Sequence, residues 1–368
     1  MNLILSEEIN TNRQFNLDLI KALAISVMVV CPPVLQFSVA MAPVNPDFES
    51  DFPFFLAVYI LGSYMPVAHA FMFAMGVGIV FSSKNSPREL IRRGIFIYIL
   101  AYVLNFLRYG IYAVYLYITT GVFDEWSRFC MLSQDIFYFA ALSLVLTGIL
   151  KLIKLKEIHI FIISVVMSVV GGFLAFTVDT GSYVLNYMIG HYIVTPGLTS
   201  CFTLLNWYIF VGTGLLFGYL IRRVRELDKF YLRLLIVSSV VAAVYVIITL
   251  ISGESFFMSK KNDYYALSLP ESIGLLSIDF AFLSAFHFVR EEKIPKAASV
   301  IKTMSKNVMA IYMIHWIIIG NVDCWIIRDR EVNVGYPLMY VFGIVLIVLS
   351  YLLAKLWADH CRSFFFKP

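Results

Sequence analysis

A few ionisable side chains fall inside long apolar segments of the sequence. They are His69, Arg108, Asp279, His287 and His315. A charged group near the middle of a bilayer costs about 3 kcal/mol or more unless it faces the protein interior or water, so such groups are candidates for function. We expect His69 and Asp279 at similar depth in two different helices, and a carboxylate that orients an imidazole produces a general base. The sequence therefore predicts a catalytic set of His69 and Asp279, with His315 as a third member.

Each of these residues also has a purely structural interpretation. His69 and His315 could hydrogen-bond neighbouring helices and stabilise packing, and Arg108 could extend its guanidinium to the outer interface. The functional alternative for Arg108 is a two-point grip on a carboxylate, a phosphate or a sugar hydroxyl. With Asn105 just before it and His191 in an outer loop, Arg108 makes a candidate substrate-binding set.

Four basic residues, Lys84, Arg88, Arg92 and Arg93, gather after the second apolar segment. Their ordinary explanation is a topology signal, because cytoplasmic loops collect Lys and Arg. The alternative is that they bind the phosphates of a cytoplasmic donor such as coenzyme A.

Other chemistries lose their usual sequence support. The chain has no GxxxxGK[ST], GxGxxG, HExxH or GxSxG motif, which argues against nucleotide hydrolysis, dinucleotide binding, zinc proteolysis and α/β-hydrolase chemistry. Its five cysteines include no CxxC pair, so we expect no metal site. The basic residues lie in short loops rather than on a water-facing patch, so we expect no nucleic-acid partner.

The elements that position these residues are membrane-spanning helices. The 368 residues are 60% hydrophobic and 14% charged, whereas soluble domains are about half apolar and about a quarter charged. Apolar runs of about 20 residues, enough to cross a bilayer, recur from Leu17 onward, and they are apolar all round, which favours helices over barrel strands. We predict an all-α polytopic membrane bundle of about ten spans, at residues 17–41, 55–82, 90–108, 132–151, 159–178, 204–222, 231–251, 270–289, 307–326 and 337–359.

The distribution of basic residues predicts the orientation of this bundle. Lys and Arg should concentrate in cytoplasmic loops, and all but six of the 28 fall on one side if both termini are cytoplasmic. The six exceptions are Arg108, Arg128, Lys260, Lys261, Arg328 and Arg330. This pattern predicts a multi-pass protein of the inner or plasma membrane with a cytoplasmic segment at 1–16, a transmembrane domain at 17–360 and a cytoplasmic tail at 361–368.

The two ends and the long outer segments carry further expectations. The first sixteen residues contain Glu7 and Glu8 without a basic leader region, so we do not expect a cleaved signal peptide. The outer segments at 109–130 and 179–203 are rich in aromatic and apolar residues. We expect them to be loops that fold back onto the protein or the interface.

Five stretches carry a family resemblance. They are residues 16–25 (NLDLIKALAI), 69–78 (HAFMFAMGVG) with 92–94 (RRG), 134–140 (QDIFYFA), 205–210 (LNWYIF) with Gly214 and Gly218, and 304–307 (MSKN) with 311–316 (IYMIHW). In order and spacing they resemble the bacterial membrane proteins grouped with the catalytic domain of heparan-α-glucosaminide N-acetyltransferase, within the wider acyltransferase-3-like set. The resemblance covers most of the chain.

The resemblance implies an enzyme that transfers an acyl group, typically acetyl, across the bilayer. The donor would be cytoplasmic acetyl-CoA or another acyl-CoA, used as a co-substrate with no bound cofactor, and the acceptor an extracytoplasmic sugar or lipid-linked glycan. It also adds Asn206 and Trp207 to the candidate substrate site.

The match to the family is not complete at the catalytic histidine. The family's lumenal enzyme carries that residue in the outer segment before the second span, where residues 42–60 contain no histidine. The acyltransferase-3 proteins place one at the end of span one, where this chain has Cys31 and Pro32. His69 is the substitute that depth and motif favour, as base or transient acyl carrier, with Cys31 a distant second.

Two hypotheses from other classes stay open. A transporter or exporter of a small polar or glycan substrate would also use many spans and buried polar groups. Transporter folds often show repeats and matching broken helices, however, and Pro32 and Pro33 in the first span have no clear counterpart in the sixth or seventh span. The missing family histidine also leaves room for a degenerate membrane scaffold. Besides the lipid bilayer, a homo-oligomeric partner is compatible with the sequence.

Overall fold

The computed structural model describes residues 5, 7–40, 53, 56–57, 60–62, 64–123, 127, 131–196, 201–252, 264–330, 332 and 334–360, with the side chains of 34–40 left aside. Several predictions fall outside these residues. They concern Arg128, Lys260, Lys261, most of 42–60 and the tail at 361–368.

The described chain is helical throughout, without strands, and the predicted all-α polytopic membrane fold is confirmed. Eight of its helices are long and apolar enough to cross a membrane: Phe15–Pro33, Pro87–Thr120, Glu157–Leu174, Leu204–Ile221, Leu227–Ile251, Leu269–His287, Val308–Arg328 and Tyr336–His360. Two shorter apolar helices, α3 (Ala68–Phe81) and α7 (Ile136–Leu152), lie at predicted spans two and four. The side of the membrane on which each terminus lies stays a prediction.

The second span is not the continuous helix predicted from 55 to 82. The helix is interrupted at residues 65–67, and α3 begins at Ala68. Pro66 lacks an N–H for the preceding turn, and its ring restricts the residue before it to extended backbone, so the helix ends at this point. The interruption places His69 in the first turn of α3.

The helix that begins at Pro87 continues into a segment predicted to be an outer loop. It consists of α4 (Pro87–Asn105), the π-helical η1 (Phe106–Gly110) and α5 (Ile111–Thr120). It ends at Gly121, whose left-handed conformation (φ 70°) lets its N–H bond to the Tyr117 carbonyl. The loop prediction is therefore wrong as far as Thr120.

The chain divides into two compact units, which are described separately. The first unit comprises Met1–Leu17, Ala68–Val103 and Leu132–Val289. The second unit comprises Asp18–Val67, Leu104–Met131 and Arg290–Pro368.

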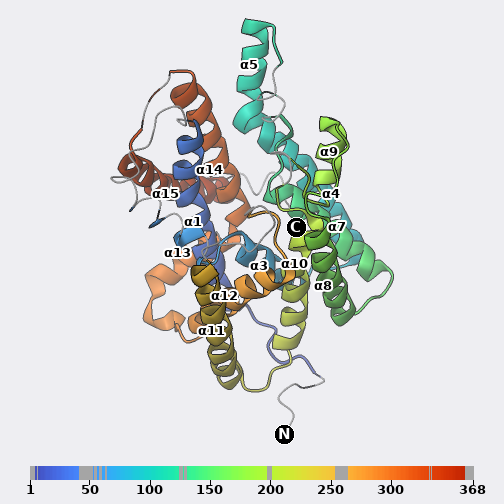
Figure 1. The fold of residues 1–368 in the computed structure, drawn as a ribbon. Helices are drawn as coiled ribbons and strands as arrows, with labels where there is room; N and C mark the ends of the chain where they lie inside the picture. Colours follow the sequence, from blue (N-terminus) through green and yellow to red (C-terminus); the bar gives the residue numbers. More distant parts are fainter. Residues whose placement is uncertain are drawn as a thin grey trace. The chain divides into compact units, whose positions relative to one another are not determined.

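Helices of the first unit approach one another where glycines remove side-chain bulk. The α3 helix crosses α10 (Leu204–Ile221) (Figure 1) with the backbones nearly touching. A Cβ atom at Gly76 would lie 2.3 Å from the Val211 carbonyl oxygen, and one at Gly214 would lie 2.1 Å from that of Phe73. Small residues that let backbones approach are the usual means of helix association in membranes. Gly76 and Gly214 thus let α3, the helix that carries His69, lie directly against α10.

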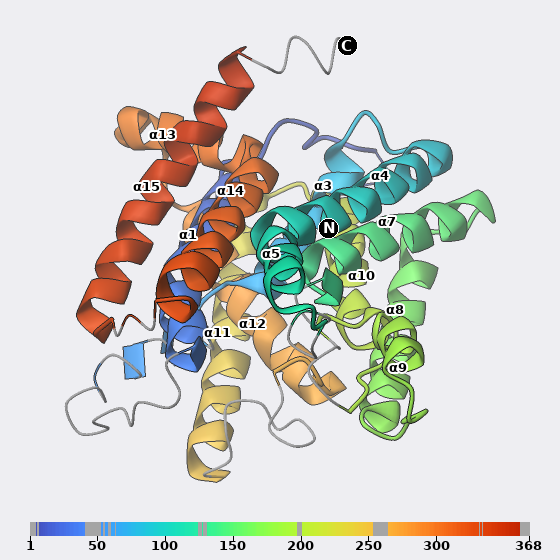
Figure 2. The ribbon, with the colours of Figure 1, turned by 90° about the horizontal axis from the view of Figure 1, so that it is seen from above.

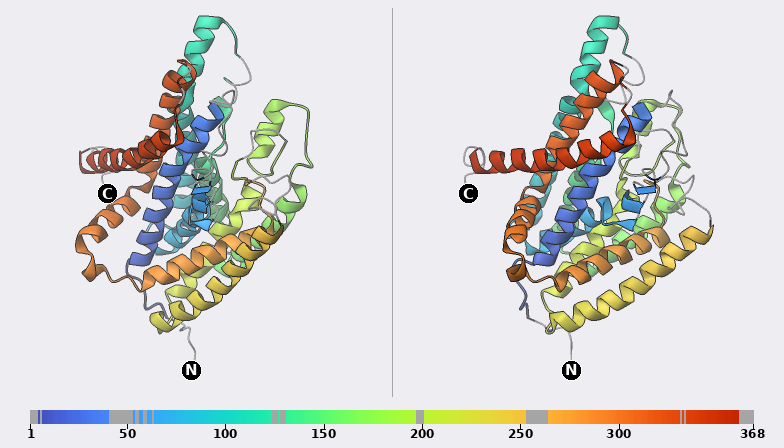
Figure 3. Two further views of the ribbon diagram at one scale, coloured as in Figure 1. Left: turned by 60° about the vertical axis from the view of Figure 1, so that its left-hand side comes forward. Right: turned by 90° about the vertical axis from the view of Figure 1, so that its left-hand side faces the viewer.

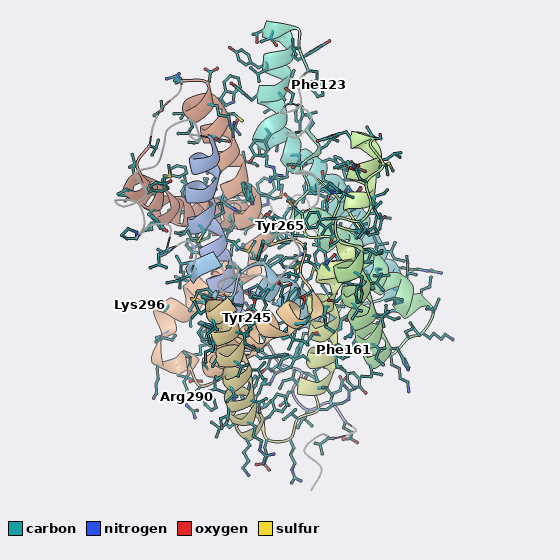
Figure 4. All side chains as sticks on the ribbon, viewed as in Figure 1. Phe123, Phe161, Tyr245, Tyr265, Arg290 and Lys296 are labelled. Carbon is teal, nitrogen blue, oxygen red and sulfur yellow. The ribbon has the colours of Figure 1, made fainter. Side chains whose placement is uncertain are left out.

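Further helices complete the packing of the first unit. The α8 helix (Glu157–Leu174) packs on α10, and α4 runs beside α7 (Figure 2), where Gly94 faces the backbone of Ala141. The α11 helix (Leu227–Ser252) runs alongside α12 (Leu269–His287) (Figure 3), with the Tyr245 ring of α11 (Figure 4) filling the space above Gly274 of α12. The short α9 (Tyr183–Gly190) lies in the outer segment at 179–203.

The second unit contains α1 from Asp18 onward, α13 (Pro295–Lys306), α14 (Val308–Val322) with the π-helical η4 (Asp323–Arg328), and α15 (Tyr336–His360). The α13 helix occupies a segment predicted to be a basic cytoplasmic loop. It is amphipathic: Ala298 and Met304 are buried and Ser305 donates to the Asp18 carboxylate at 2.6 Å, whereas Lys296 and Lys306 are exposed. The loop prediction was wrong because a short amphipathic helix carries too little apolar sequence to stand out in a search for spans.

Candidate functional site

His69 lies at the α3–α10 crossing of the first unit and is fully buried. Its ring is 5.9 Å from the ring of Phe210 on α10, centroid to centroid. Its Nδ1 atom lies 2.9 Å from both carboxylate oxygens of Asp279 on α12, which is also fully buried. Three helices therefore converge on one imidazole.

The contact with Asp279 determines which nitrogen of His69 can react. An ionised carboxylate only accepts hydrogen bonds, so Nδ1 carries the proton and Nε2 carries the lone pair of the neutral ring. Nε2 is buried, and no hydrogen-bond partner for it exists in the described part of the chain. A buried polar atom without a partner costs stability, so it indicates either strain or a role in binding or chemistry.

An aromatic wall, a row of aromatic side chains in contact, extends from His69 toward the N-terminal end of α10. Phe210 contacts Trp207, and Trp207 contacts Tyr264, at centroid distances of 5.3 Å each. Burial raises the pKa of the Tyr264 phenol, and the nearby charge of Asp279 adds to the effect. Sequence reasoning did not identify Tyr264, which lies in no motif and becomes a neighbour of the pair only through folding.

The predicted substrate residues Asn206 and Trp207 both anchor the segment that precedes α12. Asn206 donates to the Leu267 carbonyl at 2.8 Å and accepts from Thr203 at 2.9 Å. Trp207 donates from Nε1 to the Tyr265 carbonyl at 3.0 Å (Figure 4). Both the oxygen and the nitrogen of the Asn206 amide are thus engaged in structural hydrogen bonds. Trp207 also belongs to the aromatic wall.

His191 follows α9 and is buried among residues of α4, α7 and α9. Gln134 donates to the Tyr187 carbonyl at 2.8 Å and lies 3.0 Å from His191 Nδ1, and the Tyr98 hydroxyl lies 3.5 Å from His191 Nε2. The ring of Tyr138 packs edge-on against the imidazole. Burial lowers the pKa of His191 from its ordinary 6.5. The expectation that this outer segment folds back onto the protein therefore holds for its described residues.

His315, Arg108 and Asn105 belong to the second unit, and all three are buried. His315 and Arg108 both contact Trp316. Cys31 is buried in the same unit against Val27 and Val67, in apolar surroundings. The structure thus brings His69 together with Asp279 in one unit, and Arg108 together with His315 in the other.

The four basic residues of the predicted donor site lie in the turn between α3 and α4 and in the first turns of α4, a segment that we name the basic turn (residues 84–93). Lys84, Arg88, Arg92 and Arg93 are all exposed, and Arg93 donates to the Lys84 carbonyl at 3.3 Å. No group of three His, Cys, Asp or Glu side chains suited to a metal ion occurs in the parts of the chain described.

A model of the family described as heparan-alpha-glucosaminide N-acetyltransferase, catalytic, matches residues 13–248. The chain belongs to this family. No curated protein matches it. Membership indicates a membrane acetyltransferase, in agreement with the apolar helices. The matched region includes His69, Arg108 and the basic turn, and it ends before Asp279 and His315.

Proposed function

We propose that the protein transfers an acetyl group from cytoplasmic acetyl-CoA to an amine or hydroxyl of a sugar or glycan on the other side of the membrane, with His69 and Asp279 as the reacting pair. The observation that carries the proposal is the buried Nε2 of His69, which holds a lone pair and lacks a partner among the described residues. Family membership supports the acetyl group, and the acceptor and direction rest on the predicted topology.

The pair suits either of two roles in acyl transfer. As acyl carrier, Nε2 attacks the thioester carbonyl, the carbon–sulfur bond breaks, and the thiolate leaves and takes a proton from solvent; the acceptor then attacks the acetyl carbonyl, the bond from the carbonyl carbon to Nε2 breaks, and the acceptor's proton passes to solvent. As general base, Nε2 takes the proton of the acceptor while the acceptor attacks the thioester directly; the carbon–sulfur bond breaks, and the departing thiolate receives that proton from the imidazolium. In both roles the imidazole becomes positive, and the Asp279 carboxylate at 2.9 Å stabilises that charge.

The basic turn supports the choice of acetyl-CoA as donor. Coenzyme A carries several phosphate charges, and Lys84, Arg88, Arg92 and Arg93 supply four cationic groups within ten residues. Their exposure leaves them available to a soluble ligand. The predicted topology places this turn in the cytoplasm, where acetyl-CoA is found.

The test is incubation of the purified, detergent-solubilised protein with radiolabelled acetyl-CoA. Wild type, His69→Ala, Asp279→Asn and the control His360→Ala, which changes an exposed histidine at the end of α15, are compared for acetyl-CoA consumption and for label on the chain. We expect turnover in wild type and His360→Ala, and its loss in His69→Ala.

Label that stays on the chain distinguishes the acyl carrier from the general base. Stable acetylation of wild type but not of His69→Ala supports the carrier, and turnover without label supports the base. Equal acetyl-CoA consumption by wild type and His69→Ala would remove His69 from the mechanism, and no binding or consumption by wild type would reject the donor.

A further inference from the structure

A second buried histidine repeats the hydrogen-bonding state of His69 in the second unit. His315 on α14 is fully buried, and its Nδ1 donates to the Ile311 carbonyl one turn earlier at 3.1 Å. That bond places the lone pair on Nε2, as Asp279 does for His69. The Nε2 atom of His315 is buried and has no hydrogen-bond partner within the described ranges.

A buried guanidinium accompanies this imidazole. Arg108 of η1 lies over the ring of Tyr109 at 5.0 Å and over the ring of Trp316 at 5.2 Å. The Trp316 ring is also 5.4 Å from the ring of His315, so one indole contacts both the guanidinium and the imidazole. The aromatic contacts hold the cation beside the imidazole.

Close contacts between η1 and α14 hold Arg108 and His315 near each other. A Cβ atom at Gly320 would lie 2.5 Å from the Arg108 carbonyl oxygen, so α14 and η1 meet backbone to backbone. Asn321 donates to the Leu107 carbonyl at 2.9 Å. The π-helical turn of η1 is itself a feature often found at functional sites. The contacts at Gly320 and at Asn321 therefore hold Arg108 in place against α14.

We propose that Arg108 and His315 form a binding site for the acetyl acceptor, a sugar that carries an anionic carboxylate or phosphate beside its hydroxyl or amino groups. Nε2 of His315 accepts a hydrogen bond from an O–H or N–H of the ligand, and Arg108 binds the anionic oxygens. The thioester group itself offers no such donor, whereas the attacking group of an acyl acceptor is an O–H or N–H. This inference rests on the proposed function.

The experiment measures binding without acetyl-CoA, by calorimetric titration of the solubilised full-length protein with two probes, glucosamine 6-phosphate and glucuronate. Wild type should bind at least one of them. His315→Ala and Arg108→Gln should weaken that binding at least tenfold, and Arg108→Lys, which keeps the charge but loses the two-point geometry, should weaken it less than Arg108→Gln. Plain glucosamine, which lacks the anion, should discriminate little between wild type and Arg108→Gln.

Two controls separate loss of the site from loss of the fold. His360→Ala should bind the probes as wild type does, and each site variant should keep a monodisperse elution profile and the thermal unfolding midpoint of wild type. If Arg108→Gln fails to fold, the comparison of His315→Gln with His315→Ala tests the site alone. Gln retains a hydrogen-bond acceptor there and should bind better than Ala.

The outcomes also separate this inference from the proposed function. His69-dependent use of acetyl-CoA together with no binding of either probe, or with equal binding by wild type and both site variants, overturns the inference and keeps the function. Binding that depends on Arg108 and His315 in a protein that never uses acetyl-CoA overturns the function and the assignment of the ligand as acetyl acceptor.

Discussion

At the scale of single residues, the chemistry of His69 depends on the group that holds its other nitrogen. A lone buried imidazole could carry its proton on either nitrogen. The Asp279 carboxylate removes that freedom, because both of its oxygens lie 2.9 Å from Nδ1 and neither can donate. Asp279 also supplies the negative charge that a transiently positive ring needs in a dry site.

Asp279→Asn should therefore lower acetyl transfer by about 10²- to 10⁴-fold. The amide can donate to Nδ1, which moves the ring proton to Nε2 and removes the reactive lone pair. Initial rates with labelled acetyl-CoA measure the effect. The thermal unfolding midpoint should not fall, since the substitution removes a buried charge, and near-normal rates in this variant would show that the orientation of the proton is irrelevant.

His191 should make the protein less stable in mild acid. Because burial lowers its pKa below 6.5, the unfolded chain takes up a proton before the folded chain does. The stabilisation of the folded state is complete above about pH 6.5 and is lost as the pH falls toward the depressed pKa. The thermal midpoint should thus decline between pH 7.5 and 5, and His191→Gln should show a smaller decline.

The groups that face His191 support this assignment. The aromatic rings of Tyr98, Tyr138 and Tyr187 and the amide of Gln134 surround it, and none of them titrates in this range. His360→Gln, which changes an exposed histidine, serves as the control. The same decline in His191→Gln as in wild type would assign the acid sensitivity to another group.

At the scale of helices, the position of His69, the proposed catalytic residue, depends on the α3–α10 crossing. Gly76→Ala would place a methyl group 2.3 Å from a backbone oxygen of Val211, which cannot move aside as a side chain can. We expect a lower thermal midpoint, poor recovery from the membrane, and loss of acetyl transfer in the protein that remains. Yield, midpoint and rate per folded molecule are the measurements.

Gly78→Ala is the matched control on the same helix. A Cβ atom at Gly78 meets nothing within 4 Å, and alanine is favoured over glycine in a helix by roughly 1 kcal/mol. This variant should be as stable as wild type or more stable. Equal behaviour of Gly76→Ala and Gly78→Ala would mean that the close crossing does not determine stability.

The helices also show what the sequence can and cannot predict. Long apolar helices such as α10 and α11 begin within a few residues of the predicted positions, because the bilayer imposes a length that hydropathy records. The interruption at Pro66 was visible as a proline but was hidden within a continuous apolar run. The extension to Thr120 was missed because its tyrosines are as typical of an interfacial loop as of a helix.

The candidate site likewise has features that the sequence predicts and features that only the fold reveals. The depth argument led to His69 and Asp279, and the structure places the two side chains in contact, while their catalytic role stays a prediction. The partnerless Nε2 atoms and the π-helical turn at Arg108 depend on packing between segments far apart in the chain, which no local pattern records. For the same reason, sequence reasoning named Asn206 as a substrate residue although its amide is used to anchor a loop.

At the scale of the whole molecule, the proposed direction of transfer depends on a topology that basic residues predict. For transfer in the proposed direction, the basic turn at 84–93 must face the cytoplasm. The α5 helix and the segment at 179–196 must then face outward. Single-cysteine labelling of a cysteine-free protein in intact cells tests this with a maleimide that cannot cross membranes. Thr120→Cys and Thr180→Cys should be labelled directly, because both positions are exposed.

Lys84→Cys and Lys156→Cys, also exposed, should be labelled only after the cells are opened, since the excess of Lys and Arg retains these loops in the cytoplasm. Labelling of opened cells shows that all four thiols can react, so absence of label in intact cells reports location rather than burial. The reverse pattern would place the basic turn outside, where acetyl-CoA is absent. The basic turn could then not bind the donor, and acetyl transfer across the membrane would require a donor site formed by other residues.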